Sequence, residues 1–305
     1  MKKLCIYAVC TVFLSVLLFS CASSKKSRLR PMNITNTYTS TVNYYELANN
    51  DLCAGRYKNA RTNLKLAYKS AVSIDESDLL CRISLSAITY RVSVPDSDLE
   101  DDEAFLNKSV AELLFDAKTF ASRTDRVDFF MAACTIYEVR IELAYGGTDY
   151  AAYLAKLNAA EKTLSSEPFY QGHLNRTKGD VCILMKDFGN AERFFKKAAE
   201  LHTMNRYLME IGTDWYGVAR SCSLSGRKVD AVSAISNALK YDKDAENTAA
   251  IAFDYYAYAK ILLKGTVSDN DRATAKQYAA WSESIFRSGG FIDEADASAI
   301  LKESI

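Results

Sequence analysis

The sequence predicts an all-α fold, a solenoid of about six helical hairpins with a C-terminal capping helix. From about Tyr38 onward, segments rich in alanine, leucine, lysine and glutamate carry apolar residues at three- and four-residue spacing. This spacing is typical of amphipathic helices. Short breaks containing glycine, aspartate, asparagine or proline separate the segments, and such residues commonly end helices. We find no run with the apolar–polar alternation of a strand.

The breaks delimit thirteen predicted helices, enough for six hairpins and a terminal cap. Pro95 ends the third helix, and the acidic run 96–103 favours the N-terminus of the fourth through the helix dipole. Binding of Ca²⁺ by this run is the alternative, although it lacks the central glycine and the final glutamate of an EF-hand loop. In chain order, the predicted helices span residues 39–53, 57–74, 76–93, 103–122, 126–145, 149–165, 169–185, 188–202, 205–224, 228–241, 246–264, 270–287 and 291–303.

The second helices of three hairpins share one register. The turns 55–57, 186–188 and 226–228 are each followed, at identical spacing, by an alanine, a large apolar residue and a second alanine. Paired helices approach to about 8–10 Å, so small residues are needed at the contact. The residues in register are Ala60, Leu64 and Ala67; Ala191, Phe195 and Ala198; and Ala231, Ile235 and Ala238.

This register resembles the second half of the tetratricopeptide repeat, and the first helices match the first half. In the first helix of the family's repeat, a large residue is followed four positions later by glycine or alanine. The corresponding pairs in this sequence are Tyr44 with Ala48, Asn175 with Gly179, Trp215 with Ala219 and Tyr255 with Ala259. Gly179, Ala219 and Ala259 are evenly spaced, and their period is longer than the roughly 34 residues of the family. The extra residues are expected between hairpins, around 202–208 and 241–247. The resemblance covers about 40–75 and 170–287, whereas 76–165 matches by period only. It implies a right-handed superhelix with a concave surface.

The last predicted helix, 291–303, is expected to cap the solenoid. Its Ile292, Ala295, Ala299 and Ile300 would face inward, with acidic residues mostly on the outer side. Terminal repeats need such a polar outer face.

The N-terminal segment resembles a bacterial lipoprotein signal peptide. A basic start is followed by an apolar run from Leu4 to Phe19, and the run ends at Ser20-Cys21. The resemblance implies cleavage before Cys21 and acylation of that residue. A transmembrane anchor is the alternative, but the run is shorter than the roughly 20 residues of a span. We expect a signal peptide at 1–20, a lipidated flexible tether at 21–37 and the helical repeat domain at 38–305.

Composition fits a secreted globular body that does not bind nucleic acid. Lysine plus arginine and aspartate plus glutamate both total 38, so the basic excess that nucleic-acid binding usually requires is missing. The cysteines of the repeat domain are widely spaced among apolar neighbours, which predicts small buried hydrophobes; one disulfide or a reactive thiol is the alternative. They are Cys53, Cys81, Cys134, Cys182 and Cys222.

Motifs of catalysis are absent from the sequence, so we expect neither enzymatic activity nor a cofactor. It contains no HExxH, Gly-rich phosphate loop, CxxC pair or nucleophile elbow. A zinc site on its two histidines, His173 and His202, would need further ligands from other hairpins, and we expect no metal. Two SxxK matches, at Ser23 and Ser225, fall in the tether and in a repeat turn, where they are expected to be chance.

The concave face is the remaining candidate site. In the repeat family, set positions of each first helix line this face, and tyrosine and arginine are common binding anchors. By resemblance we expect a partner to contact the C-terminal half of the groove. The candidate partner-binding residues are His173, Arg176, Asp180, Tyr216, Arg220, Phe253, Tyr256 and Lys260.

These features together predict a lipid-anchored scaffold or adaptor on the periplasmic face of the inner or outer membrane of a bacterial envelope. Its partners would be an envelope protein or peptide in the concave groove, and the lipid bilayer through acylated Cys21. The alternative is a small-ligand carrier with a pore or pocket in the superhelix, which the tyrosine-rich segment 253–258 would suit.

Overall fold

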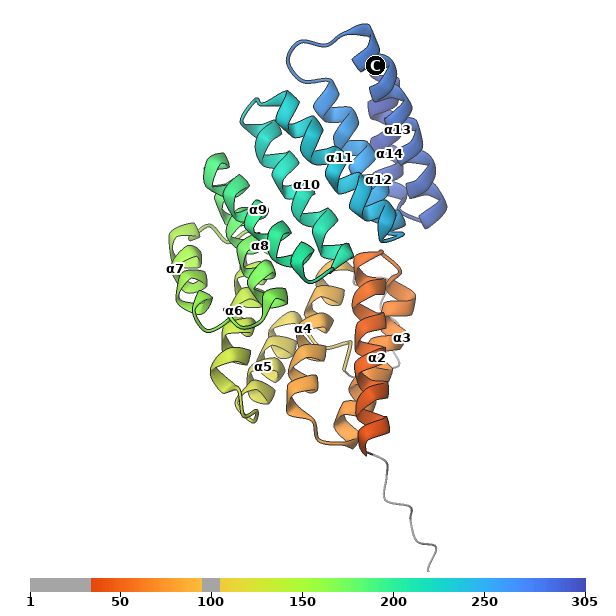
Figure 1. Ribbon diagram of the computed structural model, residues 1–305. Coiled ribbons are helices and arrows are strands. Elements are labelled where there is room, and N and C mark those ends of the chain that lie inside the picture. Colours follow the sequence, from red (N-terminus) through yellow and green to blue (C-terminus); the bar gives the residue numbers. More distant parts are fainter. Residues whose placement is uncertain (1–33, 95–104) are drawn as a thin grey trace, which may run out of the picture.

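The computed structural model describes residues 34–94 and 105–305, which form α-helices and turns only (Figure 1). Cys21, the signal peptide, most of the tether and the acidic run 96–103 lie outside these residues. None of the helices in the described ranges is long and apolar enough to cross a bilayer. The helices are α2 (Ile34–Cys53), α3 (Tyr57–Ser73), α4 (Ser77–Ser93), α5 (Val110–Ala121), α6 (Val127–Ala144), α7 (Tyr150–Glu161), α8 (Pro168–Leu184), α9 (Phe188–Met204), α10 (Leu208–Leu224), α11 (Lys228–Asp244), α12 (Thr248–Leu262), α13 (Asp269–Gly289) and α14 (Ile292–Glu303).

Consecutive helices pair into six hairpins, from α2–α3 to α12–α13, and α14 packs on α13. The first helices of the hairpins also contact one another in series, from α2 and α4 through to α10 and α12. We call this series of first helices the inner layer, and each partner helix packs against it. Figure 1 shows the hairpins stacked in chain order. The predicted fold class, a helical-hairpin solenoid with a C-terminal capping helix, is confirmed.

Turns with one left-handed residue connect the regular helices. Gly55, Lys186 and Gly226 have φ of 69°, 61° and 79° within hairpins, and Arg206 and Glu246 have φ of 59° and 54° between them. In each turn the next N–H bonds back to the carbonyl five residues earlier, at 2.8–3.0 Å, as in a Schellman motif. Helices α8 to α11 are each 17 residues long, and a turn of the same length follows each of them. Equal helices and equal turns explain the even spacing of the repeats.

Several boundaries differ from the prediction. The extra residues of the long repeat period lengthen α9 and α11 to Met204 and Asp244, instead of forming linkers. Helix α5 begins at Val110, because Ser109 and Glu112 form a capping box there. Helix α2 begins at Ile34, so the last residues assigned to the tether are helical.

The alanine register places the helices in contact as expected. Ala219 and Ala259 are buried, and a Cβ at Gly179 would lie 2.8 Å from the Phe195 ring of the paired helix. Such distances leave no room for a larger side chain at these positions.

The capping helix α14 is rotated relative to the prediction. Ala295 and Ser298 are buried, whereas Ile292 and Ile300 are 51% and 69% exposed. The Ser298 hydroxyl bonds Ser282 of α13 at 3.0 Å, so a polar contact fixes the face that packs. The prediction for the two isoleucines was therefore wrong.

The solenoid curves far enough for its first hairpin to meet its last. The α2–α3 turn lies beside the turn before α14: the rings of Tyr57 and Phe291 are 6.4 Å apart, edge to face, and a Cβ on Gly55 would lie 2.6 Å from Phe291. In Figure 1 the α2–α3 hairpin lies next to the ends of α12 and α14. Helices α2 and α10 are also joined, since the Cys53 thiol donates to Glu210 at 3.7 Å.

All five cysteines of the described residues are free thiols. Cys81, Cys134, Cys182 and Cys222 are buried as predicted, but Cys53 is exposed on the inner side of the solenoid. Its thiol faces the space between the first hairpin and α10, where it reaches Glu210.

Candidate functional site

Four adjoining pockets follow the inner layer of helices, and we call them together the inner groove. We name them the N-terminal, acidic, tyrosine and arginine pockets, with volumes of about 470, 380, 230 and 350 Å³. Neighbours share lining residues: Cys53 joins the first two, Tyr216 the second and third, and Arg220 the third and fourth. Neighbouring pockets of the groove therefore share walls.

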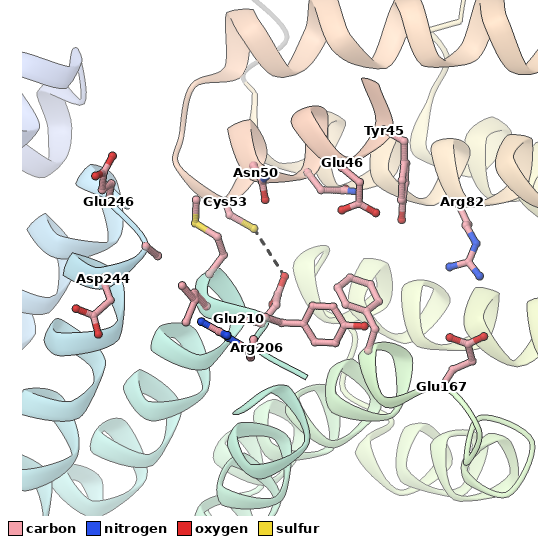
Figure 2. A pocket seen from close by; sticks show the side chains of 16 residues that line it. Tyr45, Glu46, Asn50, Cys53, Arg82, Glu167, Arg206, Glu210, Asp244 and Glu246 are labelled. Carbon is pink, nitrogen blue, oxygen red and sulfur yellow. Dashed lines mark hydrogen bonds between the residues drawn. The ribbon is translucent and has the colours of Figure 1, made fainter. Parts of the chain in front are cut away.

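The N-terminal pocket lies between α2 and α4 on one side and the starts of α8 and α10 on the other (Figure 2). Glu46 and Arg82 project into it from the first side, facing Glu167 across the gap. Tyr45 adds an aromatic ring to this wall. Partial burial raises the pKa of Glu46. This pocket therefore offers charges of both signs beside aromatic faces.

The acidic pocket lies between α10, α12 and the α2–α3 turn. Its lining includes Asp242 and Asp254, each 1% exposed, and the aromatic rings of Tyr216 and Phe253. The two carboxyl groups lie beside each other, and burial raises the pKa of both. One shared proton relieves the repulsion between two such carboxyl groups.

The cations of the tyrosine and arginine pockets form no ion pair with a carboxylate of the described residues. Arg220 and Lys260 line the tyrosine pocket together with Tyr256, and the Lys260 ammonium lies 5.1 Å from the centre of the Tyr256 ring. Arg140 and Arg220 line the arginine pocket, and neither forms an ion pair within the described ranges. Unpaired arginines can bind carboxylates or backbone carbonyls of a ligand.

Asp180 also lines the arginine pocket. Enclosure by the surrounding protein raises the pKa of this half-buried carboxyl, although Arg176, Arg140 and Arg220 oppose the shift.

A buried ionic cluster lies in the wall behind the groove. Arg176 on α8 contacts Glu210 at 2.5 Å and Asp214 at 2.7 Å, both on α10, and His202 contacts Asp214 at 2.5 Å. Burial lowers the pKa of His173 to about 4. Although burial opposes it, the Arg176 guanidinium holds the pKa of Glu210 well below its usual range.

The structure thus separates the predicted partner-binding residues into two groups. Asp180, Tyr216, Arg220, Phe253, Tyr256 and Lys260 line the groove. His173 and Arg176 line none of its four pockets and are held in the buried cluster, with Arg176 neutralised by two carboxylates. For these two residues, contact with a partner stays a prediction.

Sequence reasoning missed several groove residues. Asp242 continues the buried stripe of Ala231, Ile235 and Ala238 by four residues, and a polar residue on such a stripe was a usable signal. Asp254 lies one repeat period after Asp214. Its importance could not be recognised from the sequence, because the contacts of Asp214 with Arg176 and His202 are seen only in the structure. Arg140 lies in the region where the repeat register is weak, and nothing in its local sequence separates it from other surface arginines.

Comparisons with known proteins match this chain at the level of the fold. Neither a protein-family model nor a curated protein sequence matches it. Among solved structures, it is similar to a Rap protein complexed with competence and sporulation factor, with a TM-score of 0.59 and 15% identity over 88% of this chain and 70% of that one. The apo form of RapI gives a TM-score of 0.55 and 14% identity, over 88% and 71% of the two chains. Aspartyl phosphate phosphatase F from Bacillus subtilis gives 0.50 and 13%, over 95% and 74%. The chain therefore shares the helical-repeat fold of these proteins.

Proposed function

We propose that this chain is a non-catalytic binding protein that holds an extended peptide segment of a partner protein along its inner groove. The observation that carries the proposal is the series of four adjoining pockets, which share Cys53, Tyr216 and Arg220 as lining residues. A series of adjoining pockets suits successive side chains of an extended chain better than one compact ligand. For this reason we favour the adaptor over the small-ligand carrier.

The chemistry of the groove supports the same choice. Tyrosine and arginine supply much of the binding energy at protein interfaces, and both line this groove. One solved protein of the same fold, the Rap protein, is complexed with competence and sporulation factor, which supports a binding role for the fold.

A competition between groove and outer-surface variants tests this function. The probe is a positional-scanning library of N-acetylated nonapeptides, with affinity for the full chain measured by fluorescence polarisation. We expect Tyr256→Ala to weaken the selected peptides at least about tenfold, because truncating a central aromatic anchor commonly costs more than about 2 kcal/mol. Phe115→Ala, which removes a ring that is 70% exposed on α5, is the matched control and should change nothing. Loss of binding in the control but not in Tyr256→Ala would reject the groove as the site.

We further propose that the chain is anchored through acylated Cys21 on the periplasmic face of the inner or outer membrane of a bacterial envelope. The support is the sequence alone: a basic start, an apolar run and a small residue before Cys21. More than one acyl chain gives stable anchoring. Cells expressing Cys21→Ser should yield a protein that incorporates no labelled palmitate and leaves the membrane fraction on washing, whereas Cys53→Ser should remain labelled. Labelling of the Cys21→Ser protein would exclude this anchor.

A further inference from the structure

The acidic pocket and the buried cluster occupy equivalent places in successive repeats. The interval from the start of α8 to the start of α10 equals that from α9 to α11, and each helix has the same length as its counterpart. The close packing repeats as well. A Cβ on Gly172 would lie 2.2 Å from the His202 ring, and one on Gly212 would lie 2.3 Å from the Asp242 carboxyl. Positions separated by this interval can therefore be compared directly.

In the first copy, the protein fills this place with its own cationic groups. Arg176 bridges Glu210 and Asp214, and His202 bonds the second oxygen of Asp214 at 2.5 Å. His173 fills the remaining space beside Glu210, at 3.6 Å. Every carboxylate of this cluster has a basic partner.

In the second copy, one acid is kept and the basic side chains are gone. Asp254 stands at the position of Asp214, but Tyr216 replaces Arg176 and Asp242 replaces His202. The smaller residues Thr213 and Ala250 replace His173 and Glu210. All five of these residues line the acidic pocket, so the pocket is the space that basic side chains fill one repeat earlier.

The carboxyl groups of this pocket are left without a basic partner. Within the described ranges, Asp242 Oδ1 and Asp254 Oδ2 are buried and have no hydrogen-bond partner. A buried, unpaired polar atom costs free energy that a ligand can recover. The rings of Tyr216, Phe253 and Phe291 surround the space, and aromatic faces attract cations.

We propose that the acidic pocket receives a basic side chain of the bound peptide, with arginine preferred over lysine. The inference rests on the proposed function and specifies the chemistry of the partner. The guanidinium of the ligand would take the role that Arg176 plays one repeat earlier, contacting Asp254 as Arg176 contacts Asp214. Arginine is preferred because its planar fork can bond two carboxyl groups at once.

The peptide library described above provides the first test. Peptides selected by the full chain should share one arginine position, and replacing that arginine with citrulline, its neutral counterpart, should weaken binding at least about tenfold. Asp254→Asn should weaken the arginine peptide by a similar factor and leave the citrulline peptide unchanged. The control Asp125→Asn, at an exposed position outside the groove, should leave both affinities unchanged.

A second variant fills the pocket with the protein's own cation. The double substitution Tyr216→Arg with Ala250→Glu recreates the arrangement of Arg176 with Glu210 and Asp214. We expect this variant to melt at a higher temperature than the wild type and to lose the arginine preference. A lower melting temperature would show that the two places are not equivalent and would overturn the inference.

The outcomes separate this inference from the proposed function. Peptides that bind the groove, depend on Tyr256 and show no basic preference would overturn the inference and leave the function standing. Selection of 1,4-diaminobutane over every arginine peptide, in competition at equal concentration, would overturn both, because the ligand would then be a small cation.

Discussion

We expect the stability of this protein to depend on pH through the protonation of one pair of side chains, Asp242 and Asp254. Both carboxyl groups are buried, and burial raises the pKa of each above its ordinary value near 4. The folded chain therefore keeps a proton that the unfolded chain releases once the pH exceeds that ordinary value. A raised pKa of this kind stabilises the fold at low pH and loses its effect as the pH rises through the raised value.

Replacing Asp254 with asparagine should flatten this dependence. Wild-type stability should fall as the pH rises from about 4 through neutrality, whereas Asp254→Asn carries a neutral amide at every pH. The difference in free energy of unfolding should grow by up to about 1.4 kcal/mol per pH unit in favour of the variant. Urea denaturation at several pH values measures it, with Asp125→Asn as the exposed control. Parallel curves for wild type and Asp254→Asn would show that the pair holds no extra proton.

At the scale of the elements, left-handed turns and alanine contacts set the geometry of each hairpin. Three turns within hairpins occupy equivalent positions, two with glycine and one with Lys186. A side chain in the left-handed region costs about 1–2 kcal/mol, and glycine avoids this cost. Lys186 is thus an unfavourable residue at a position that the fold requires.

The substitution Lys186→Gly should therefore stabilise the protein, by roughly 1 kcal/mol once the greater freedom of glycine in the unfolded chain is subtracted. Lys240→Gly, on the exposed face of α11, is the control and should destabilise by a similar amount because glycine is a poor helix former. Thermal unfolding of the two variants measures both effects. A loss of stability in both would mean that position 186 does not need the left-handed conformation.

The alanine contacts should be intolerant of larger residues. Ala259 is fully buried and packs with Ala275 and Ala279 of α13. A leucine there must separate the helices or distort rotamers, at a cost of about 1–3 kcal/mol. We expect Ala259→Leu to melt well below Lys240→Leu, and equal melting temperatures would contradict the assigned contact.

At the scale of the whole molecule, contact between the first and last hairpins closes the solenoid and shapes the groove. The N-terminal pocket has one wall on α2 and α4 and the other on the starts of α8 and α10, so it exists only while this closure holds. The acidic pocket likewise includes Gly55 and Tyr57 of the first hairpin. Opening the solenoid would remove both pockets.

Two glycines at equivalent turns allow the closure to be tested. Gly55→Ala and Gly226→Ala both place a side chain at positive φ, but only the first brings its Cβ to 2.6 Å from Phe291; the second meets nothing within 4 Å. Gly226→Ala should therefore cost about 1–2 kcal/mol, and Gly55→Ala should cost more. This extra loss of stability should disappear when Gly55→Ala is made in a Phe291→Leu background, where the ring is no longer present. Urea denaturation measures the free energy of unfolding of each variant. Equal losses for the two single variants would show that the first hairpin does not press on Phe291.

The sequence by itself determined the parts of this protein that depend on local contacts. Helix period, turn residues and alanine spacing predicted the hairpins, their number and their long repeat period, because a helix and its partner follow one another directly in the chain. The same register predicted six of the groove-lining residues of the C-terminal half: Asp180, Tyr216, Arg220, Phe253, Tyr256 and Lys260. It also predicted that Cys81, Cys134, Cys182 and Cys222 would be buried.

Tertiary structure alone decided how the hairpins close on one another and which polar side chains meet. Small rotations between repeats accumulate along a solenoid, so the contact between Cys53 and Glu210, 157 residues apart, cannot be obtained from any local pattern. The same holds for Arg176, whose register position predicted a groove contact but whose charge is neutralised by two carboxylates of the next repeat. The acidic pocket is recognised by comparing two repeats in space. Their backbone packing is the same, but the basic side chains of the first repeat are absent from the second, which leaves a cavity. Only the structure shows that nothing else from the described residues fills this cavity.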